Sequence, residues 1–128
     1  MSGETILVVD DDKASSKLAR VVLQREGYEV RTAADAEDAL AMLASLAPSL
    51  ILMDVHLPGL DGLALTRRLK SAAATRDIVI LAVTASATKR DEESALAAGC
   101  NGYLTKPIDT RSLPKFIADC LAAGRATS

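Results

Sequence analysis

Residues 6–12 read Ile-Leu-Val-Val-Asp-Asp-Asp, a short apolar run that ends in three carboxylates. Further short runs rich in aliphatic or β-branched residues follow along the chain, and segments with helical periodicity separate them. The expected strands cover residues 6–9, 29–33, 50–53, 78–83 and 102–105. Three of these runs are apolar throughout, which is typical of strands that helices cover on both faces of a parallel sheet.

The regular alternation of strands and helices predicts the fold class. We expect an α/β fold with a flavodoxin-like, doubly wound, five-stranded parallel sheet in the order 2-1-3-4-5 and helices on both faces. Residues 1–128 are expected to form a single domain with a core from about residue 4 to residue 121. Residues 124–128 are expected to be a flexible tail.

Helical spacing predicts which side chains the first two helices bury. Asp12 is expected to cap the first helix, whose buried face would carry Ala14, Leu18, Val21 and Val22. Asp35 is expected to cap the second, and Pro48 to prevent its continuation. The apolar stripe of this second helix would consist of Ala36, Leu40, Leu43 and Ala47.

Composition excludes several classes of protein. The formal net charge is −2, and the basic residues are scattered, so we expect neither nucleic acid nor a membrane surface as a partner. Apolar runs are far shorter than the roughly 20 residues that span a bilayer, and no basic stretch opens a signal peptide. A cytoplasmic location is therefore expected. Cys100 and Cys120 are interpreted as reduced packing residues.

Polar side chains follow the expected strands where those strands end. The first strand leads into Asp10 and Asp11, the third into Asp54, the fourth into Thr84 and the fifth into Lys106. Because the first and third strands are neighbours in the predicted order, their carboxylates should share one crevice. Two carboxylates about 4 Å apart repel by roughly 4 kcal/mol at an effective dielectric constant near 20. One lysine offsets part of this charge, and a hard divalent cation such as Mg²⁺ would offset the rest.

Each of these residues also has a simpler interpretation when it is taken alone. An acidic run after a strand is often a solvated turn, with Asp12 as the helix cap. An aspartate such as Asp54 is common before a Pro-Gly turn. Thr84 could cap a strand end. The joint occurrence of the acid pair, the single aspartate, the hydroxyl and the Lys-Pro pair at four strand ends favours a functional site.

The motifs of the chain resemble a known family. Residues 6–12, residues 52–62 (Leu-Met-Asp-Val-His-Leu-Pro-Gly-Leu-Asp-Gly), residues 83–85 (Val-Thr-Ala) and residues 99–108 occur in the order and at the intervals of receiver domains from two-component response regulators. The resemblance covers residues 4–121. The stretch from residue 84 to residue 108 is most similar to stand-alone receivers and to those of phosphorelays and hybrid kinases.

The resemblance implies a phosphoacceptor site. Asp54 would accept a phosphoryl group from a sensor histidine kinase or a histidine phosphotransfer protein. Asp11, Asp54 and the backbone carbonyl of His56 would bind Mg²⁺ or Mn²⁺ directly, and Asp10 would act through water. Lys106 would contact a phosphoryl oxygen.

The resemblance also implies a switch. Thr84 and Tyr103 would change position on phosphorylation and alter the surface of the fourth helix, fifth strand and fifth helix, where a downstream protein would bind. The peptide bond before Pro107 would be cis. We hypothesise that the side chains of His56 and Ser86 tune the lifetime of the phosphoryl group. The protein is expected to be a monomer or a weak dimer.

Other functions fit the sequence less well. A haloacid-dehalogenase-like phosphatase would use Asp10 and Asp12, but Ala14 stands where that family has Thr or Val. A flavin-binding protein would need a Ser/Thr/Gly-rich phosphate loop and aromatic residues, which make up only 2% of the chain. A structural pseudo-receiver would lack part of the acid, hydroxyl and lysine set. We therefore expect no enzyme activity beyond self-catalysed phosphorylation and dephosphorylation.

Overall fold

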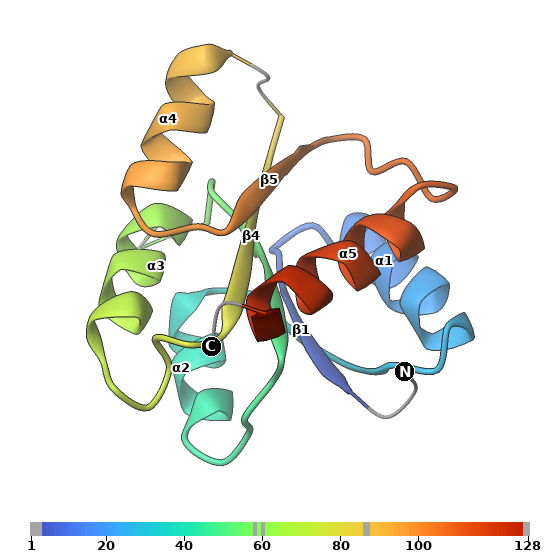
Figure 1. The fold of residues 1–128 in the computed structure, drawn as a ribbon, viewed down its shortest axis with the longest axis horizontal. Helices are drawn as coiled ribbons and strands as arrows, with labels where there is room; N and C mark the ends of the chain where they lie inside the picture. The colour runs from blue at the N-terminus through green and yellow to red at the C-terminus, as the bar shows by residue number, and fades with distance from the viewer. Residues whose placement is uncertain (1–3, 58, 60, 86–87, 127–128) are drawn as a thin grey trace.

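A computed structural model describes residues 4–57, 59, 61–85 and 88–126. These residues form a five-stranded sheet in the order β2-β1-β3-β4-β5, and each neighbouring pair of strands is parallel. Helices cover both faces of the sheet, as Figure 1 shows. The predicted fold class and strand order are confirmed.

The strands and helices alternate along the whole chain. The strands are β1 (Thr5–Val9), β2 (Glu29–Ala33), β3 (Leu50–Asp54), β4 (Val79–Thr84) and β5 (Gly102–Thr105). The helices are α1 (Lys13–Arg25), α2 (Ala36–Leu43), α3 (Gly62–Ser71), α4 (Lys89–Ala97) and α5 (Leu113–Ala126). Two strands extend one residue further than the apolar runs predict, so that β3 ends at Asp54 itself and β4 at Thr84 itself.

Side chains alternate along the central strands and so build two cores. Ile6 and Val8 of β1 belong to the core beneath α1 and α5, whereas Leu7 and Val9 belong to the core beneath α2, α3 and α4. Figure 1 shows α1 and α5 together on one side of the sheet and the other three helices on the opposite side. This arrangement explains the continuous apolar runs, because both faces of β1, β3 and β4 are buried.

The predicted buried face of α1 is wrong for two of its four residues. Ala14 is exposed and the Leu18 side chain is 43% exposed. The residues of α1 that the protein buries are Ser16, Ala19 and Leu23. Two of these side chains are small, which allows α1 to lie close to the sheet. Of the predicted set, Val22 packs at the edge of the core.

Two helix boundaries also differ from expectation. Helix α2 ends at Leu43, so Ala47 lies beyond it and is exposed instead of continuing the apolar stripe. The chain leaves the helix through turns in which Ser45 and Leu46 donate backbone hydrogen bonds to the Met42 carbonyl. Helix α5 continues over residues 124–126, part of the predicted tail. Residues 127 and 128 lie outside the described residues.

Both cysteines are free thiols, Cys100 buried and Cys120 partly buried. Their packing roles are as predicted. In the part of the chain that the structure describes, every helix is too short or too polar to cross a membrane.

A half-buried lysine joins three segments at the end of the sheet opposite the strand-end carboxylates. The Lys70 ammonium at the end of α3 donates hydrogen bonds to the carbonyls of Arg76 and Ile78, at 3.1 and 2.6 Å, and to the side-chain oxygen of Asn101 at 3.0 Å. Asn101 Oδ1 also accepts a hydrogen bond from the Ile80 amide. Burial lowers the pKa of Lys70. Lys70 therefore ties α3 to the start of β4 and to the turn between α4 and β5.

Replacement of Lys70 by Met should destabilise the fold. Methionine keeps most of the aliphatic stem but lacks the ammonium group. The oxygen atoms that accept hydrogen bonds from Lys70 therefore lose this donor. We expect the free energy of unfolding to fall by about 1–3 kcal/mol in urea titrations. Lys17→Met, at an exposed position on α1, is the control and should change the free energy of unfolding little. An equal effect of both substitutions would contradict the role assigned to Lys70.

Candidate phosphoacceptor site

Three carboxylates meet where β1 and β3 end. Oxygen atoms of Asp10, Asp11 and Asp54 all lie within 4.8 Å of one another. Asp10 and Asp54 are only 7% and 4% exposed, whereas Asp11 is exposed. The pairing of β1 with β3, in which Val9 lies opposite Met53, brings these residues together. The predicted convergence is thus present in the structure.

Lys106 lies among these carboxylates. Its ammonium is 3.2 Å from Asp10 Oδ2 and 3.5 Å from Asp54 Oδ2. It follows β5, and its backbone amide donates to the Thr84 carbonyl at 2.7 Å, which holds it against the end of β4. The bond between Lys106 and Pro107 is cis, as predicted. Lys106 is thus the described cation closest to the acidic cluster.

Backbone amides fix one oxygen of each buried carboxylate. The Asp12 amide donates to Asp10 Oδ1 at 2.9 Å, and the His56 amide donates to Asp54 Oδ1 at 3.0 Å. Asp54 therefore holds one oxygen against the backbone and turns the other toward Lys106. The His56 side chain itself is exposed.

Burial and charge act in opposite directions in this cluster. Burial raises the pKa of Asp10, although the Asp12 amide and Lys106 partly counteract it. Burial alone would lower the pKa of Lys106, but the hydrogen bond and negative charge of Asp10, together with Asp54, raise it overall. The site thus favours the protonated form of Lys106, whereas ionisation of Asp10 costs more free energy here than in water.

The donor set of the cluster suits a small hard cation. The three carboxylates offer oxygen ligands in a compact group, which are the ligands that Mg²⁺ prefers. Lys106 supplies a single positive charge against three negative ones, so the group retains an excess of negative charge. These residues therefore fit the magnesium ion that the sequence predicts.

A close backbone contact positions Asp54. Gly62 begins α3 directly against the end of β3: a methyl group on Gly62 would overlap the Asp54 carbonyl and come within 2.9 Å of Val55 Cα. The Gly62 amide donates to the Val55 carbonyl at 3.2 Å. Glycine is needed here because only hydrogen fits between the two backbones. In the sequence, residue 62 stands out only as the glycine that ends the motif over residues 52–62.

Thr84 and Tyr103 lie on the same face of the sheet. Ala82 is paired with Tyr103 and Thr84 with Thr105, so the two predicted switch residues are diagonal neighbours on adjacent strands. Thr84 is 3% exposed, and Tyr103 is half-buried against the core beneath α2, α3 and α4. Both residues therefore face α4. Ser86 lies outside the described residues.

The environment of Asp12 does not favour the phosphatase alternative. Its side chain is exposed and caps α1 by accepting hydrogen bonds from the Ala14 amide and the Ser15 hydroxyl. The Ser15 hydroxyl and the Ala14 amide lower the pKa of Asp12. An aspartate held in this way is a helix cap, whereas a general acid would need a raised pKa and a position facing Asp10.

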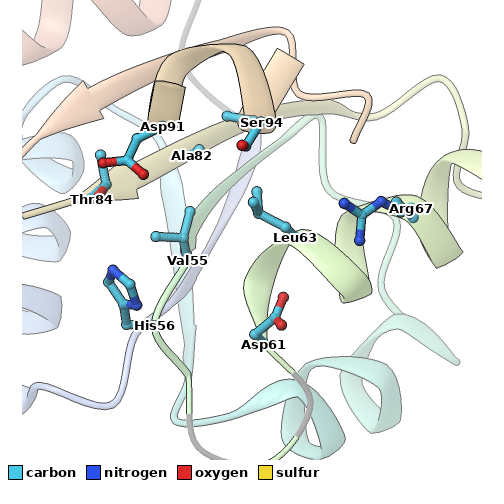
Figure 2. A pocket seen from close by; sticks show the side chains of 10 residues that line it. Val55, His56, Asp61, Leu63, Arg67, Ala82, Thr84, Asp91 and Ser94 are labelled. Carbon is cyan, nitrogen blue, oxygen red and sulfur yellow. The ribbon is translucent and has the colours of Figure 1, made fainter. Parts of the chain in front are cut away.

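A cavity of about 280 Å³ opens between α3 and α4 beside the carboxylate cluster. Figure 2 shows Thr84 and Asp91 at one end of it, and Arg67 at another. Its other lining residues are Val55, His56, Asp61, Leu63, Ala82, Ser94 and Ala95. No local pattern in the sequence predicts this cavity, because it lies between two helices from separate parts of the chain.

Comparison with known proteins identifies the family. The model for the response regulator receiver domain matches residues 6–118. The chain belongs to this family. Receiver domains are parts of signalling proteins rather than classical enzymes, and the resemblance stated from the motifs is confirmed.

Relatives of this receiver domain differ in length. It is 43% identical over 118 residues to the response regulator PleD of Caulobacter vibrioides, covering 87% of the chain but only 26% of PleD. It is 39% identical over 114 residues to the polar-differentiation response regulator DivK of Brucella anthropi, covering 89% of the chain and 90% of DivK. The chain thus spans about a quarter of one relative and most of the other.

Solved structures show the same fold. A putative response regulator from Chloroflexus aurantiacus is 36% identical, with a TM-score of 0.90 over 94% of this chain and 99% of that one. A CheY-like receiver domain protein from Methanospirillum hungatei is 31% identical, with a TM-score of 0.89 over 99% of this chain and 100% of that one.

Replacement of Asp10 by Asn should stabilise the metal-free receiver domain and weaken its affinity for Mg²⁺. The asparagine side chain still offers an oxygen to the backbone amide of Asp12, but it no longer carries the buried negative charge. Burial raises the pKa of the Asp10 carboxyl, so loss of that charge should be favourable. We expect a gain on the order of 1 kcal/mol in the free energy of unfolding, a usual size for one substitution. Thermal unfolding with EDTA and with Mg²⁺ measures both effects.

Asp12→Asn is the matched control for this experiment. Because hydrogen bonds lower the pKa of Asp12, loss of its charge should reduce stability rather than raise it. The prediction would be contradicted if Asp10→Asn, measured with EDTA, lost stability as Asp12→Asn does.

Replacement of Gly62 by Ala should disturb the site through the backbone of Asp54. The added methyl group has to push β3 and α3 apart, and overpacking of this kind costs about 1–3 kcal/mol. We expect lower stability in urea and weaker Mg²⁺ binding than in wild type. Stability and Mg²⁺ affinity equal to those of wild type would show that the close contact is not needed.

Proposed function

We propose that the protein accepts a phosphoryl group on Asp54 from a histidine kinase or a histidine phosphotransfer protein. The observation that carries this proposal is the buried carboxylate of Asp54, placed between Asp10, Asp11 and the Lys106 ammonium at the end of β3. Such a cluster binds a cation and presents a carboxylate to an incoming phosphoryl group. Membership in the receiver family supports the same function.

Asp54 is the nucleophile in the proposed reaction. One carboxylate oxygen forms a bond to phosphorus while the bond from phosphorus to the donor's imidazole nitrogen breaks, and the imidazole leaves with the electron pair. No general base is required because a carboxylate oxygen has no proton to lose when it attacks phosphorus. The transition state of phosphoryl transfer is loose, so positioning and charge neutralisation are the main contributions that a protein makes. Lys106 supplies positive charge to a phosphoryl oxygen.

Mg²⁺ or Mn²⁺ is the proposed cofactor. Asp11, Asp54 and the backbone carbonyl of His56 would hold it directly, and Asp10 would hold it through water. The cation supplies charge neutralisation between the carboxylate and the phosphoryl oxygens. The compact group of carboxylate oxygens supports this assignment.

Thr84 and Tyr103 form the proposed switch. Phosphorylation adds about −1.5 to −2 charges and three acceptor oxygens beside the buried Thr84 hydroxyl, so that hydroxyl moves toward Asp54. Tyr103, on the same face of the sheet, then moves into the space that Thr84 leaves. The surface of α4, β5 and α5 changes, and a downstream protein reads the change.

We place the protein in the cytoplasm as a stand-alone or phosphorelay receiver, monomeric or weakly dimeric. The similarity to DivK, most of whose length the chain covers, supports this role. The exposed His56 side chain beside Asp54 is the proposed modulator of phosphoryl lifetime.

Acetyl phosphate with Mg²⁺ tests the proposed function. Intact-mass measurement should show one phosphoryl adduct on the wild-type protein, no adduct without Mg²⁺ and no adduct on Asp54→Asn. Asp61→Asn is the matched control, because Asp61 caps α3 in the same loop and Asn caps helices equally well. This variant should be phosphorylated like the wild type.

Two results would contradict the proposal. One is an adduct that persists in Asp54→Asn, which would place the phosphoryl group elsewhere. The other is release of free phosphate from many unrelated monoesters, which would favour a phosphatase that uses Asp10 and Asp12.

A further inference from the structure

An acidic side chain of α4 lies beside the switch threonine. Asp91 and Thr84 line the same cavity, and Figure 2 shows the Asp91 carboxylate turned toward the Thr84 side chain. Thr84 is the last residue of β4, whereas Asp91 lies in the first turn of α4. A side chain of the switch surface therefore meets the residue that is expected to respond to phosphorylation.

The position of Asp91 is well defined by its own helix. The Thr88 hydroxyl donates to Asp91 Oδ2 at 2.8 Å, and the Asp91 amide donates to Thr88 Oγ1 at 3.2 Å. These two bonds form the cap of α4. Because Asp91 belongs to this cap, any displacement of its carboxylate acts directly on the first turn of α4.

We propose that Asp91 is a positioning residue that holds the Thr84 hydroxyl in the unphosphorylated protein and competes for it with the phosphoryl group on Asp54. A threonine hydroxyl has a single proton to donate, so it can satisfy one of these acceptors at a time. Both acceptors are anionic, and hydrogen bonds to either are charge-assisted. The inference rests on the proposed function of Asp54.

The competition gives the switch a defined resting state. Without the phosphoryl group, the Asp91 carboxylate keeps Thr84 directed toward α4. The three phosphoryl oxygens then attract the hydroxyl toward Asp54, and the first turn of α4 loses its contact with β4. The free energy of this exchange is small because one charge-assisted hydrogen bond replaces another. Asp91 therefore sets the balance between the two states.

Asp91→Asn isolates the charge of this residue. The amide oxygen can still accept from Thr88, so the cap of α4 is retained, but a neutral acceptor binds the Thr84 hydroxyl more weakly. Glu93→Gln is the matched control, because it removes the same charge from an exposed position two residues further along α4.

The experiment measures binding of beryllofluoride, a mimic of the phosphoryl group, in the presence of Mg²⁺. The half-saturating concentration is followed by the amide NMR signals of residues 84 and 85. We expect Asp91→Asn to lower the half-saturating concentration of beryllofluoride about fivefold, a usual size for a coupling between sites. Glu93→Gln should leave this concentration unchanged. Equal values for wild type and Asp91→Asn would overturn the inference.

A double-mutant cycle separates this role from a structural one. In the background of Thr84→Ala, which has no hydroxyl, Asp91→Asn should no longer change the half-saturating concentration. The same fivefold effect in both backgrounds would show that Asp91 acts by charge or by helix stability alone, and would overturn the inference.

The wild-type protein distinguishes failure of the inference from failure of the proposed function. Wild-type binding that Asp54→Asn abolishes, combined with no effect of Asp91→Asn, contradicts only the role of Asp91. Absence of Asp54-dependent binding in the wild-type protein would contradict the phosphoacceptor function and, with it, the role of Asp91.

Discussion

Repulsion among Asp10, Asp11 and Asp54 is the interaction on which the function of this protein depends. Parallel pairing of β1 with β3 places their oxygens within 4.8 Å of one another, and Lys106 supplies one ammonium among them. Burial of Asp10 adds to the cost, as its raised pKa shows. The fold therefore retains an excess of negative charge that a divalent cation relieves. A carboxylate beside bound cations can then meet a phosphoryl group without strong repulsion.

The sheet also connects this charge to a distant surface. Lys106 follows β5 and is bonded through its backbone to Thr84 at the end of β4, and Tyr103 lies on the same face of β5. Lys106, whose ammonium lies 3.5 Å from Asp54, thus connects the ends of two adjacent strands. The cavity between α3 and α4 leaves space beside Thr84, with Asp91 at its edge. Tightly packed interiors transmit such displacements, and a cavity permits them.

The two ends of α4 have different surroundings. At its C-terminal end, Lys70 holds the following turn through Asn101, and Gly99 packs directly against the Lys70 stem. At its N-terminal end, Asp91 borders the cavity and forms the helix cap together with Thr88.

Sequence alone predicted the strand order and the family, because burial on both faces of a parallel sheet requires continuous apolar runs. It also placed polar side chains at the strand ends, and the structure brings Asp10, Asp11, Asp54 and Lys106 together. Periodicity did not determine which face of α1 meets the sheet: Leu18 is 43% exposed, and Ser16 and Ala19 are buried instead. Spacing shows which residues share a face, whereas close approach to the sheet selects the face with small side chains. The contact of Gly62 with β3 and the cavity that Asp91 and Thr84 both line likewise arise only when separate segments pack together, so tertiary structure alone decided them.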